Sequence, residues 1–197
     1  DGSGSSAILM MAKNMIELKK ANFPFQNGIL FVWFTGEESG LLGSEVFSNV
    51  PTIKKENIIC NLNVDMIGRN DQIHQGNTDY LYLIGSDRIS QRLHEISEQV
   101  NNRCCQLKLD YTYNDEKDPN RYYYRSDHYN FARKGIPVLF FYDGMLKADY
   151  HKTTDTVDKI TWDLFEKRAQ MIFYTAWAIA NRDAMLIRDK PLPTATR

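Results

Sequence analysis

One stretch joins a predicted strand to two adjacent glutamates: Phe31-Val32-Trp33-Phe34-Thr35-Gly36-Glu37-Glu38-Ser39-Gly40-Leu41-Leu42-Gly43-Ser44. Its first half belongs to an apolar run rich in β-branched and aromatic residues, which predicts a buried strand over residues 29–34. The run stops at Gly36, and two adjacent carboxylates, Glu37 and Glu38, follow it. An isolated Glu-Glu pair usually marks a solvated turn. Ligands, however, bind at the carboxyl ends of strands in α/β folds, and matching polar residues occur further along this chain.

Length and composition indicate one sizeable α/β domain. The chain has 197 residues, of which 43% are apolar and 25% are charged. The net charge of -1 gives no electrostatic reason to expect nucleic acid as a partner. No apolar run approaches the roughly 20 residues that span a bilayer. Because the sequence starts at Asp1 without a methionine, we expect a single domain over residues 1–197 that is truncated at its N-terminus.

The three cysteines do not form a disulfide framework. Their number is odd, and no CxxC pair typical of zinc sites occurs. Cys60 lies in an apolar run and is predicted to be a small core residue. Cys104 and Cys105 are adjacent, so a bond between them would be strained, and both are predicted to be free thiols.

Helical and strand patterns alternate along the chain. Besides residues 29–34, strands are predicted over residues 58–66, 80–84 and 138–142, with a looser pattern over 106–113. Helices are predicted from a cap at Ser5 or Ser6 to residue 20, and over residues 41–49, 88–100, 126–134 and 161–182. The last helix has a predicted buried stripe of Trp162, Phe165, Ala169, Ile172, Phe173 and Ala176. The alternation predicts an α/β fold, a three-layer sandwich around a largely parallel mixed central sheet.

Further polar residues recur at or just beyond the predicted strand ends. They are Asp65, Asp127, His128, Asp149, Tyr150 and His151. His74 lies in a polar loop, and no nearby pattern predicts a partner for its side chain. The carboxyl ends of parallel strands share one edge of a sheet, so we expect these side chains to gather near the two glutamates. Carboxylate and imidazole ligands suit zinc in open catalytic sites. Two zinc ions would polarise a carbonyl and activate a water, and an unligated carboxylate would take the proton of that water.

Four motifs together resemble the M28 family of zinc aminopeptidases and carboxypeptidases. They are Gly36-Glu37-Glu38-Ser39-Gly40-Leu41-Leu42-Gly43-Ser44, Asn63-Val64-Asp65-Met66-Ile67-Gly68, Arg125-Ser126-Asp127-His128-Tyr129 and Tyr150-His151-Lys152-Thr153-Thr154-Asp155-Thr156. They occur in the family's order and spacing over essentially the whole chain. The resemblance implies a zinc-exopeptidase-like fold, a metallopeptidase acting on peptides, and a secreted or periplasmic location.

The resemblance also implies metal and proton roles for single residues. Glu37 resembles the general base. Glu38 and His151 resemble ligands of one zinc, and Asp65 resembles a ligand of the second. The roles of Glu37 and Glu38 are open to exchange.

Other residues are implied to contact the substrate or to support the ligands. Tyr150, or one of the tyrosines 122–124 such as Tyr123, is implied as the donor to the oxyanion of the tetrahedral intermediate. Asp127 and His128 are implied as pocket residues or as residues that support the ligands.

The N-terminal part departs from the family pattern. The family's HxD-type motif, whose histidine binds the second zinc, is absent. The family also has a bridging aspartate three residues before a Ser-Gly pair, and counting back from Ser3 lands one position before Asp1. Asp1 is therefore either the neighbour of the bridging ligand or, with a shift of one residue, the bridge itself. We expect two zinc ions in the intact protein and a poorer zinc site in this chain alone.

The resemblance implies a zinc-dependent exopeptidase, with release of N-terminal residues as the leading hypothesis and Glu37 as general base. Two alternatives stay open. One is an acyl-transfer enzyme of the glutaminyl-cyclase kind, which resembles this scaffold and uses one zinc. The other is a metal-free interaction domain, as in receptor relatives that keep the fold and lose the metal. The motifs do not encode side-chain preference, oligomeric state or the choice between amino- and carboxypeptidase.

Overall fold

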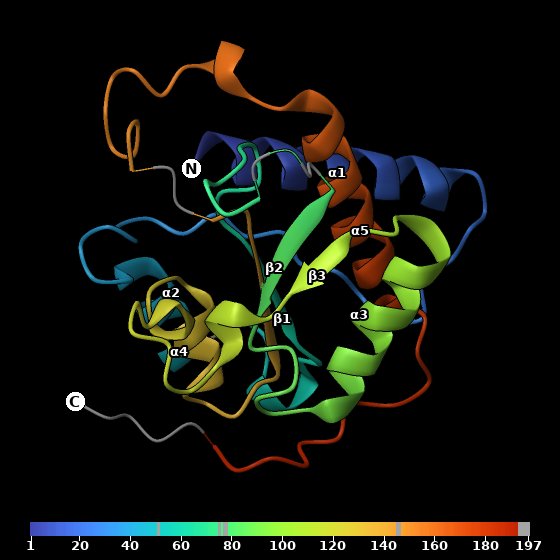
Figure 1. Ribbon diagram of the computed structural model, residues 1–197. Helices are drawn as coiled ribbons and strands as arrows, with labels where there is room; N and C mark the ends of the chain where they lie inside the picture. The colour runs from blue at the N-terminus through green and yellow to red at the C-terminus, as the bar shows by residue number, and fades with distance from the viewer. Residues whose placement is uncertain (51, 75, 77–78, 145–146, 193–197) are drawn as a thin grey trace.

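A mixed four-stranded sheet forms the middle of the molecule in the computed structural model, which describes residues 1–50, 52–74, 76, 79–144 and 147–192 (Figure 1). The strands lie in the order β1 (Asn61–Val64), β4 (Val138–Tyr142), β2 (Tyr80–Ile84) and β3 (Lys108–Asp110). β1 runs parallel to β4 and β2 runs parallel to β3, whereas β2 and β4 are antiparallel. The predicted mixed, largely parallel sheet is confirmed.

Helices cover the sheet in two groups (Figure 1). One group contains α1 (Gly2–Lys20), α3 (Gln91–Cys104) and α5 (Trp162–Ala180), in which α5 contacts both of the others. The second group contains α2 (Leu42–Asn49) and α4 (His128–Ala132), which contact each other. Short 3-10 helices lie between these elements: η1 (Lys55–Asn57), η2 (Thr112–Asn114), η3 (Tyr122–Tyr124) and η4 (Val157–Lys159).

The two central strands form the core. Every residue of β2 and β4 is buried, because both strands are flanked by other strands and covered by helices. A strand that is buried on both faces requires a continuous apolar run, and both segments have one. The predicted bounds of these two strands, 80–84 and 138–142, are confirmed residue for residue.

The predicted strand over residues 29–34 is wrong. The segment forms no ladder with a strand in the described part of the chain, and Leu30 and Trp33 are 53% and 48% exposed. A cavity of about 1470 Å³ is lined both by this segment and by residues 57–66 around β1. An apolar, β-branched composition favours a strand only where a neighbouring strand supplies backbone hydrogen bonds, and no strand among the described residues pairs with this segment.

Two predicted helix details are also wrong. α1 begins at Gly2 with Asp1 as its N-cap, in place of Ser5 or Ser6, because the Asp1 carboxylate accepts from the amides of Ser3 and Gly4. The face of α5 that packs inward is rotated from the predicted stripe, and Trp162 is 56% exposed. The buried residues of α5 are Leu164, Arg168, Met171, Ile172, Thr175, Ile179 and Ala180.

The prediction of free thiols at Cys104 and Cys105 is contradicted. The two cysteines form a disulfide. α3 ends at Cys104, so Cys105 leaves helical geometry and its side chain is free to turn toward its neighbour. Cys60, predicted to be a small core residue, is a free cysteine that is partly buried and packs against the core.

Candidate active site

The first motif forms a tight turn that presents Glu37 and Glu38. Gly36 and Gly40 have φ values of 66° and 101°, which favour glycine. The amide of Leu42 donates to the Gly36 carbonyl at 3.1 Å, which closes the turn directly before α2. The glycine-rich sequence therefore places two adjacent carboxylates at a sharp change of chain direction.

The second and third motifs meet at Asp65, directly after β1. The hydroxyl of Ser126 donates to Asp65 Oδ2 at 2.9 Å, and Asn63 Nδ2 donates to the same hydroxyl at 2.9 Å. Ser126 therefore orients the Asp65 carboxylate. Sequence reasoning missed this role for Ser126 and Asn63, although both residues lie inside quoted motifs and neither is apolar.

The first and fourth motifs meet through His151. Its Nε2 lies 2.7 Å from Glu38 Oε1, and the two side chains are 53% and 68% exposed. The ring of Tyr150 stacks on the His151 imidazole with centroids 3.8 Å apart. The structure thus brings a carboxylate and an imidazole together from positions more than 100 residues apart in sequence.

The carboxylates of the site raise one another's proton affinity. Burial, followed by the charges of Asp65, Glu38 and Asp127, raises the pKa of Glu37 to about 7. Burial also raises the pKa values of Asp65 and Asp127. All four side chains line the large cavity together with Tyr150 and His151. Glu37 is therefore a carboxylate that exchanges a proton near neutral pH.

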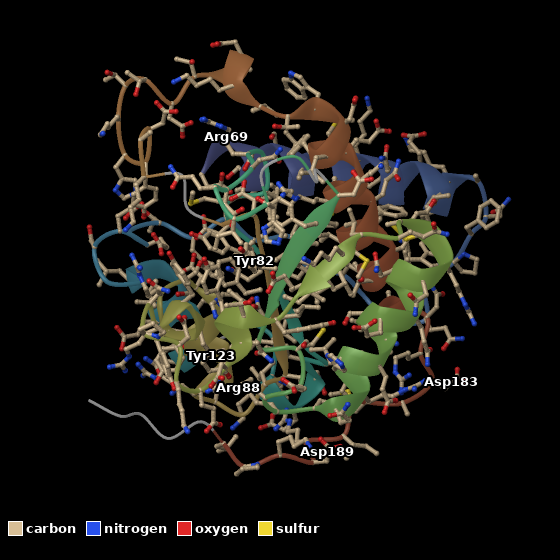
Figure 2. The ribbon with its side chains drawn as sticks, in the orientation of Figure 1. Arg69, Tyr82, Arg88, Tyr123, Asp183 and Asp189 are labelled. Atoms are coloured by element: carbon tan, nitrogen blue, oxygen red, sulfur yellow. A yellow bond between two sulfur atoms is a disulfide. The ribbon has the colours of Figure 1, made fainter. Side chains whose placement is uncertain are left out.

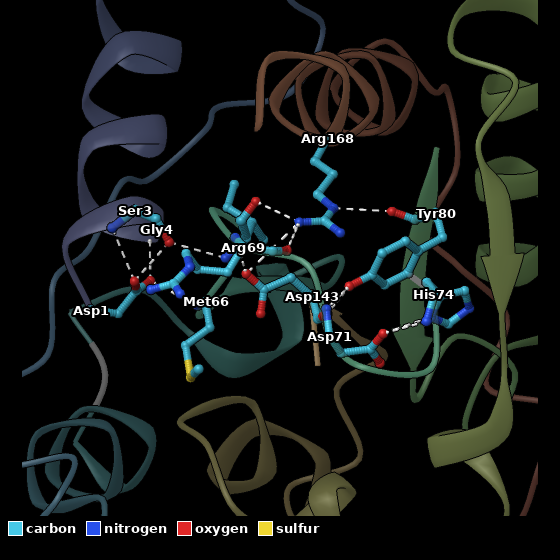
Figure 3. Close-up of polar contacts among 11 residues, drawn as sticks. Asp1, Ser3, Gly4, Met66, Arg69, Asp71, His74, Tyr80, Asp143 and Arg168 are labelled. Carbon is cyan, nitrogen blue, oxygen red and sulfur yellow. Dashed lines mark hydrogen bonds and ion pairs between the residues drawn. The ribbon is translucent and has the colours of Figure 1, made fainter. Parts of the chain in front are cut away.

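Asp1 lies beside the second motif and serves as a helix cap (Figure 3). Its Oδ2 accepts from the Gly4 amide at 2.7 Å and from the Met66 amide at 2.9 Å. Its Oδ1 accepts from the Ser3 amide at 3.0 Å. Both oxygens therefore bond to backbone amides and fix the start of α1 against the residue after Asp65.

Tyr123 and His128 lie in the core. The Tyr123 side chain is 1% exposed, and the Arg88 guanidinium lies 4.2 Å from its ring centroid (Figure 2). His128 is fully buried, with its ring 4.7 Å from that of Phe140. Neither residue lines the large cavity, whereas Tyr122 does. We therefore assign no substrate contact to Tyr123 or His128.

Acid is expected to destabilise the fold through His128. Burial lowers its pKa from 6.5 to about 3, so the fold favours the neutral ring. The unfolded chain takes up a proton below about pH 6.5, so this stabilisation is present above that pH and decreases as the pH falls toward 3. Between pH 7.5 and 4.5 we expect a loss of roughly 2–3 kcal/mol in unfolding free energy, at about 1.4 kcal/mol per unit.

Chemical unfolding of the wild type and of His128→Phe at both pH values tests this prediction. The variant should lose less stability than the wild type on acidification, because it lacks the group that is protonated on unfolding. His94→Phe is the matched control, because it removes a half-buried imidazole from α3. Equal pH dependence in the wild type and His128→Phe would contradict the prediction.

The donor set suits zinc in its chemistry. Glu38, Asp65 and His151 offer oxygen and nitrogen atoms, the ligands that zinc takes in catalytic sites. Within the described residues, however, no three His, Cys, Asp or Glu side chains surround one point as a metal ion requires. Direct contact is limited to the pair His151 and Glu38. The chain therefore supplies one adjacent donor pair, with Asp65 held close enough to raise the pKa of Glu37.

His74 belongs to a buried polar cluster that sequence reasoning missed. Its Nδ1 lies 3.0 Å from Asp71 Oδ1, and its Nε2 lies 3.2 Å from Asp110 Oδ2. Its ring stacks on Tyr80 at 3.8 Å. The cluster does not line the large cavity. Asp110 lies in β3, far from His74 in sequence, so only the tertiary fold reveals that partner.

Comparison with known proteins decides the family. The profile of Peptidase family M28 matches residues 1–176. The chain belongs to this family. As an M28 member it is 31% identical over 186 residues to a "Probable leucine aminopeptidase" of Arthroderma otae, an alignment that covers 91% of this chain and 47% of the fungal protein.

Solved structures share the fold of this M28 chain. The zinc aminopeptidase BSAP from Bacillus subtilis superposes with a TM-score of 0.73 at 23% identity, over 97% of this chain and 45% of that one. The LapA aminopeptidase of Legionella pneumophila gives a TM-score of 0.72 at 22% identity, over 93% and 47%. This M28 chain therefore spans about half the length of the relatives it matches.

Proposed function

We propose that the protein is a zinc-dependent exopeptidase that removes N-terminal residues from peptides. The observation that carries the proposal is the meeting of the Glu37-Glu38 turn with His151 above a cavity that Asp65 also lines. Two further observations support it: the raised pKa of Glu37 and membership of Peptidase family M28. The names of the relatives, which are aminopeptidases, favour release of residues from the N-terminus.

Each residue has a role that follows from its surroundings. Glu38 and His151 would hold one zinc ion, and Asp65, oriented by Ser126, would hold a second. Asp1 would also bind zinc if its carboxylate gave up the hydrogen bond from the Met66 amide. Zinc, when bound, polarises a carbonyl and lowers the pKa of water.

Glu37 accepts and donates the proton in the reaction. Its pKa of about 7 lets it take a proton from the attacking water and pass that proton to the leaving amine. The hydroxyl of Tyr150, which lines the same cavity, is the donor that we assign to the oxyanion. Glu38 and His151 are 68% and 53% exposed, so a peptide can approach them from solvent.

Hydrolysis of amino-acid 4-nitroanilides by the full protein tests the proposal. We expect release of nitroaniline that stops with a zinc chelator and returns when zinc is added. Cyclisation of a glutaminyl peptide in place of hydrolysis would favour the glutaminyl-cyclase alternative. Zinc binding without either reaction, or inactivity at saturating zinc, would contradict the proposed function.

His151→Ala is expected to reduce zinc affinity by more than roughly 10–100-fold, which is the loss when a residue that hydrogen-bonds to a metal ligand is removed. The reason is that the substitution removes one member of the adjacent donor pair with Glu38. Zinc per chain after dialysis, measured by elemental analysis, checks this prediction. His94→Ala is the control because His94 is in α3, away from the cavity. Unchanged zinc content in His151→Ala would show that this histidine is not a ligand.

A further inference from the structure

The backbone of His151 requires support from its surroundings. Its φ is 56°, in the left-handed region that costs free energy for any residue with a β-carbon. Such conformations persist where neighbouring contacts hold them. The His151 side chain contacts Tyr150 and Glu38, but it is 53% exposed. The residues on either side of it supply further support for its backbone.

Asp149, two residues before His151, is the main attachment of this loop. Its Oδ2 accepts from Arg69 Nη2 at 2.9 Å. Its Oδ1 accepts from Lys159 Nζ at 2.7 Å and from Thr154 Oγ1 at 2.8 Å. The side chain is 13% exposed. The Asp149 carboxylate thus connects the start of segment 149–159 to Thr154 and Lys159 within it and to Arg69 outside it.

Arg69 is itself fixed to the core (Figure 3). Its amide donates to Asp143 Oδ2 at 2.7 Å, and its carbonyl accepts from Arg168 Nη1 at 2.7 Å. Asp143 and Arg168 are 1% and 0% exposed. The Arg69 backbone is therefore fixed by buried groups, and from that fixed position its guanidinium bonds Asp149.

The turn around His151 starts at Asp149 as well. The Lys152 amide donates to the Asp149 carbonyl at 2.9 Å, which closes a turn with Tyr150 and His151 at its centre. Asp149 therefore anchors this segment with its carboxylate and closes the turn at His151 with its carbonyl.

We propose that Asp149, bound by Arg69, Thr154 and Lys159, is a positioning residue that holds His151 against Glu38. This inference rests on the proposed function only in taking His151 as a zinc ligand. Asp149 does not touch the reacting atoms. Its effect passes through the backbone turn to the imidazole.

Asp155 provides a matched control on the same arginine. Its Oδ1 accepts one hydrogen bond from Arg69 Nη1 at 2.8 Å, and its side chain is 53% exposed. Asp149→Asn and Asp155→Asn remove the same charge from the same loop. An effect of general electrostatics would appear in both variants, whereas positioning of His151 depends on Asp149.

The first experiment measures the zinc dissociation constant of the full protein and its anilide kinetics. For Asp149→Asn we expect zinc affinity to fall about tenfold or more. The loss in kcat should be larger than any change in KM, because a misplaced ligand disturbs the reaction more than it disturbs substrate binding. For Asp155→Asn we expect both quantities within about twofold of the wild type. Arg69→Lys, which keeps the charge and loses the planar fork, should resemble Asp149→Asn. Equal effects in the two aspartate variants would overturn the proposal.

The second experiment needs neither zinc nor activity. Amide hydrogen exchange of residues 150–153, measured by mass spectrometry on the metal-free protein, should be faster in Asp149→Asn than in the wild type and in Asp155→Asn. Unchanged exchange in Asp149→Asn would overturn the positioning role even if the enzyme is active. If the wild type binds no zinc but Asp149→Asn exchanges faster, the proposed function fails and the positioning role stands.

Discussion

Glu37→Gln is expected to lower kcat by about 100- to 10,000-fold while zinc stays bound, because the substitution removes a general base. Glutamine has nearly the shape of glutamate and accepts no proton from water. Glu37 is suited to the base role because burial and the charges of Asp65 and Glu38 raise its pKa to about 7. Steady-state kinetics on an amino-acid anilide, with zinc per chain measured on the same samples, check this prediction.

Glu38→Gln and Glu45→Gln are the control variants for Glu37→Gln. The first removes a predicted zinc ligand, and the second removes a glutamate outside the cavity. Glu38 contacts His151 at 2.7 Å, so Glu38→Gln should lower zinc affinity as well as rate. Glu45 lies in α2 and pairs with Arg133 at 3.8 Å outside the cavity, so Glu45→Gln should change neither quantity. If Glu37→Gln loses zinc and Glu38→Gln keeps it, the two glutamates exchange their roles. If Glu37→Gln keeps full activity, the general base lies elsewhere.

Arg168→Met is expected to destabilise the protein by about 3–5 kcal/mol, the range for breaking a buried ion pair from one side. The Arg168 side chain is 0% exposed and donates to the carbonyls of Tyr80, Ile67 and Arg69 at 3.0, 2.9 and 2.7 Å. Methionine fills much of the same volume but donates nothing, so these three carbonyls lose a donor. Asp143 would also lose the buried charge 3.8 Å away.

Urea unfolding of Arg168→Met and of the neighbouring Lys167→Met tests the role of burial. Lys167 pairs with Asp79 at 2.8 Å, but both side chains are over 40% exposed, so its loss should cost about 1 kcal/mol or less. Arg168→Lys should lie between the two, because it keeps a charge but loses the planar fork that reaches several carbonyls. A loss of less than about 1 kcal/mol in Arg168→Met would mean that the buried arginine contributes no net stability.

Expectations from sequence were most accurate where local composition was sufficient. β2 and β4 are short apolar runs bounded by glycine or proline, and a strand that is apolar on both faces is stable in the middle of a covered sheet. The turn with Glu37 and Glu38 was equally local, because glycines at positions 36 and 40 accept the positive φ values of the turn.

Expectations failed where a partner far along the chain was needed. Residues 29–34 have the composition of a strand but no strand beside them in the described structure. The inward face of α5 was misplaced because it is set by the buried Arg168, a residue type that apolar patterns count as exposed. Neither failure changes the fold class, because the central strands and the helices around them were predicted independently.

Residue types at short spacing are enough to predict the fold class, the two central strands and membership of Peptidase family M28. Which of the motif residues meet depends on the tertiary packing. It joined Glu38 to His151, Asp65 to Ser126 and Asp149 to Arg69, and it buried Tyr123. Each of those contacts joins residues more than 60 positions apart. Contacts at that range depend on how strands and helices pack, which local spacing does not specify.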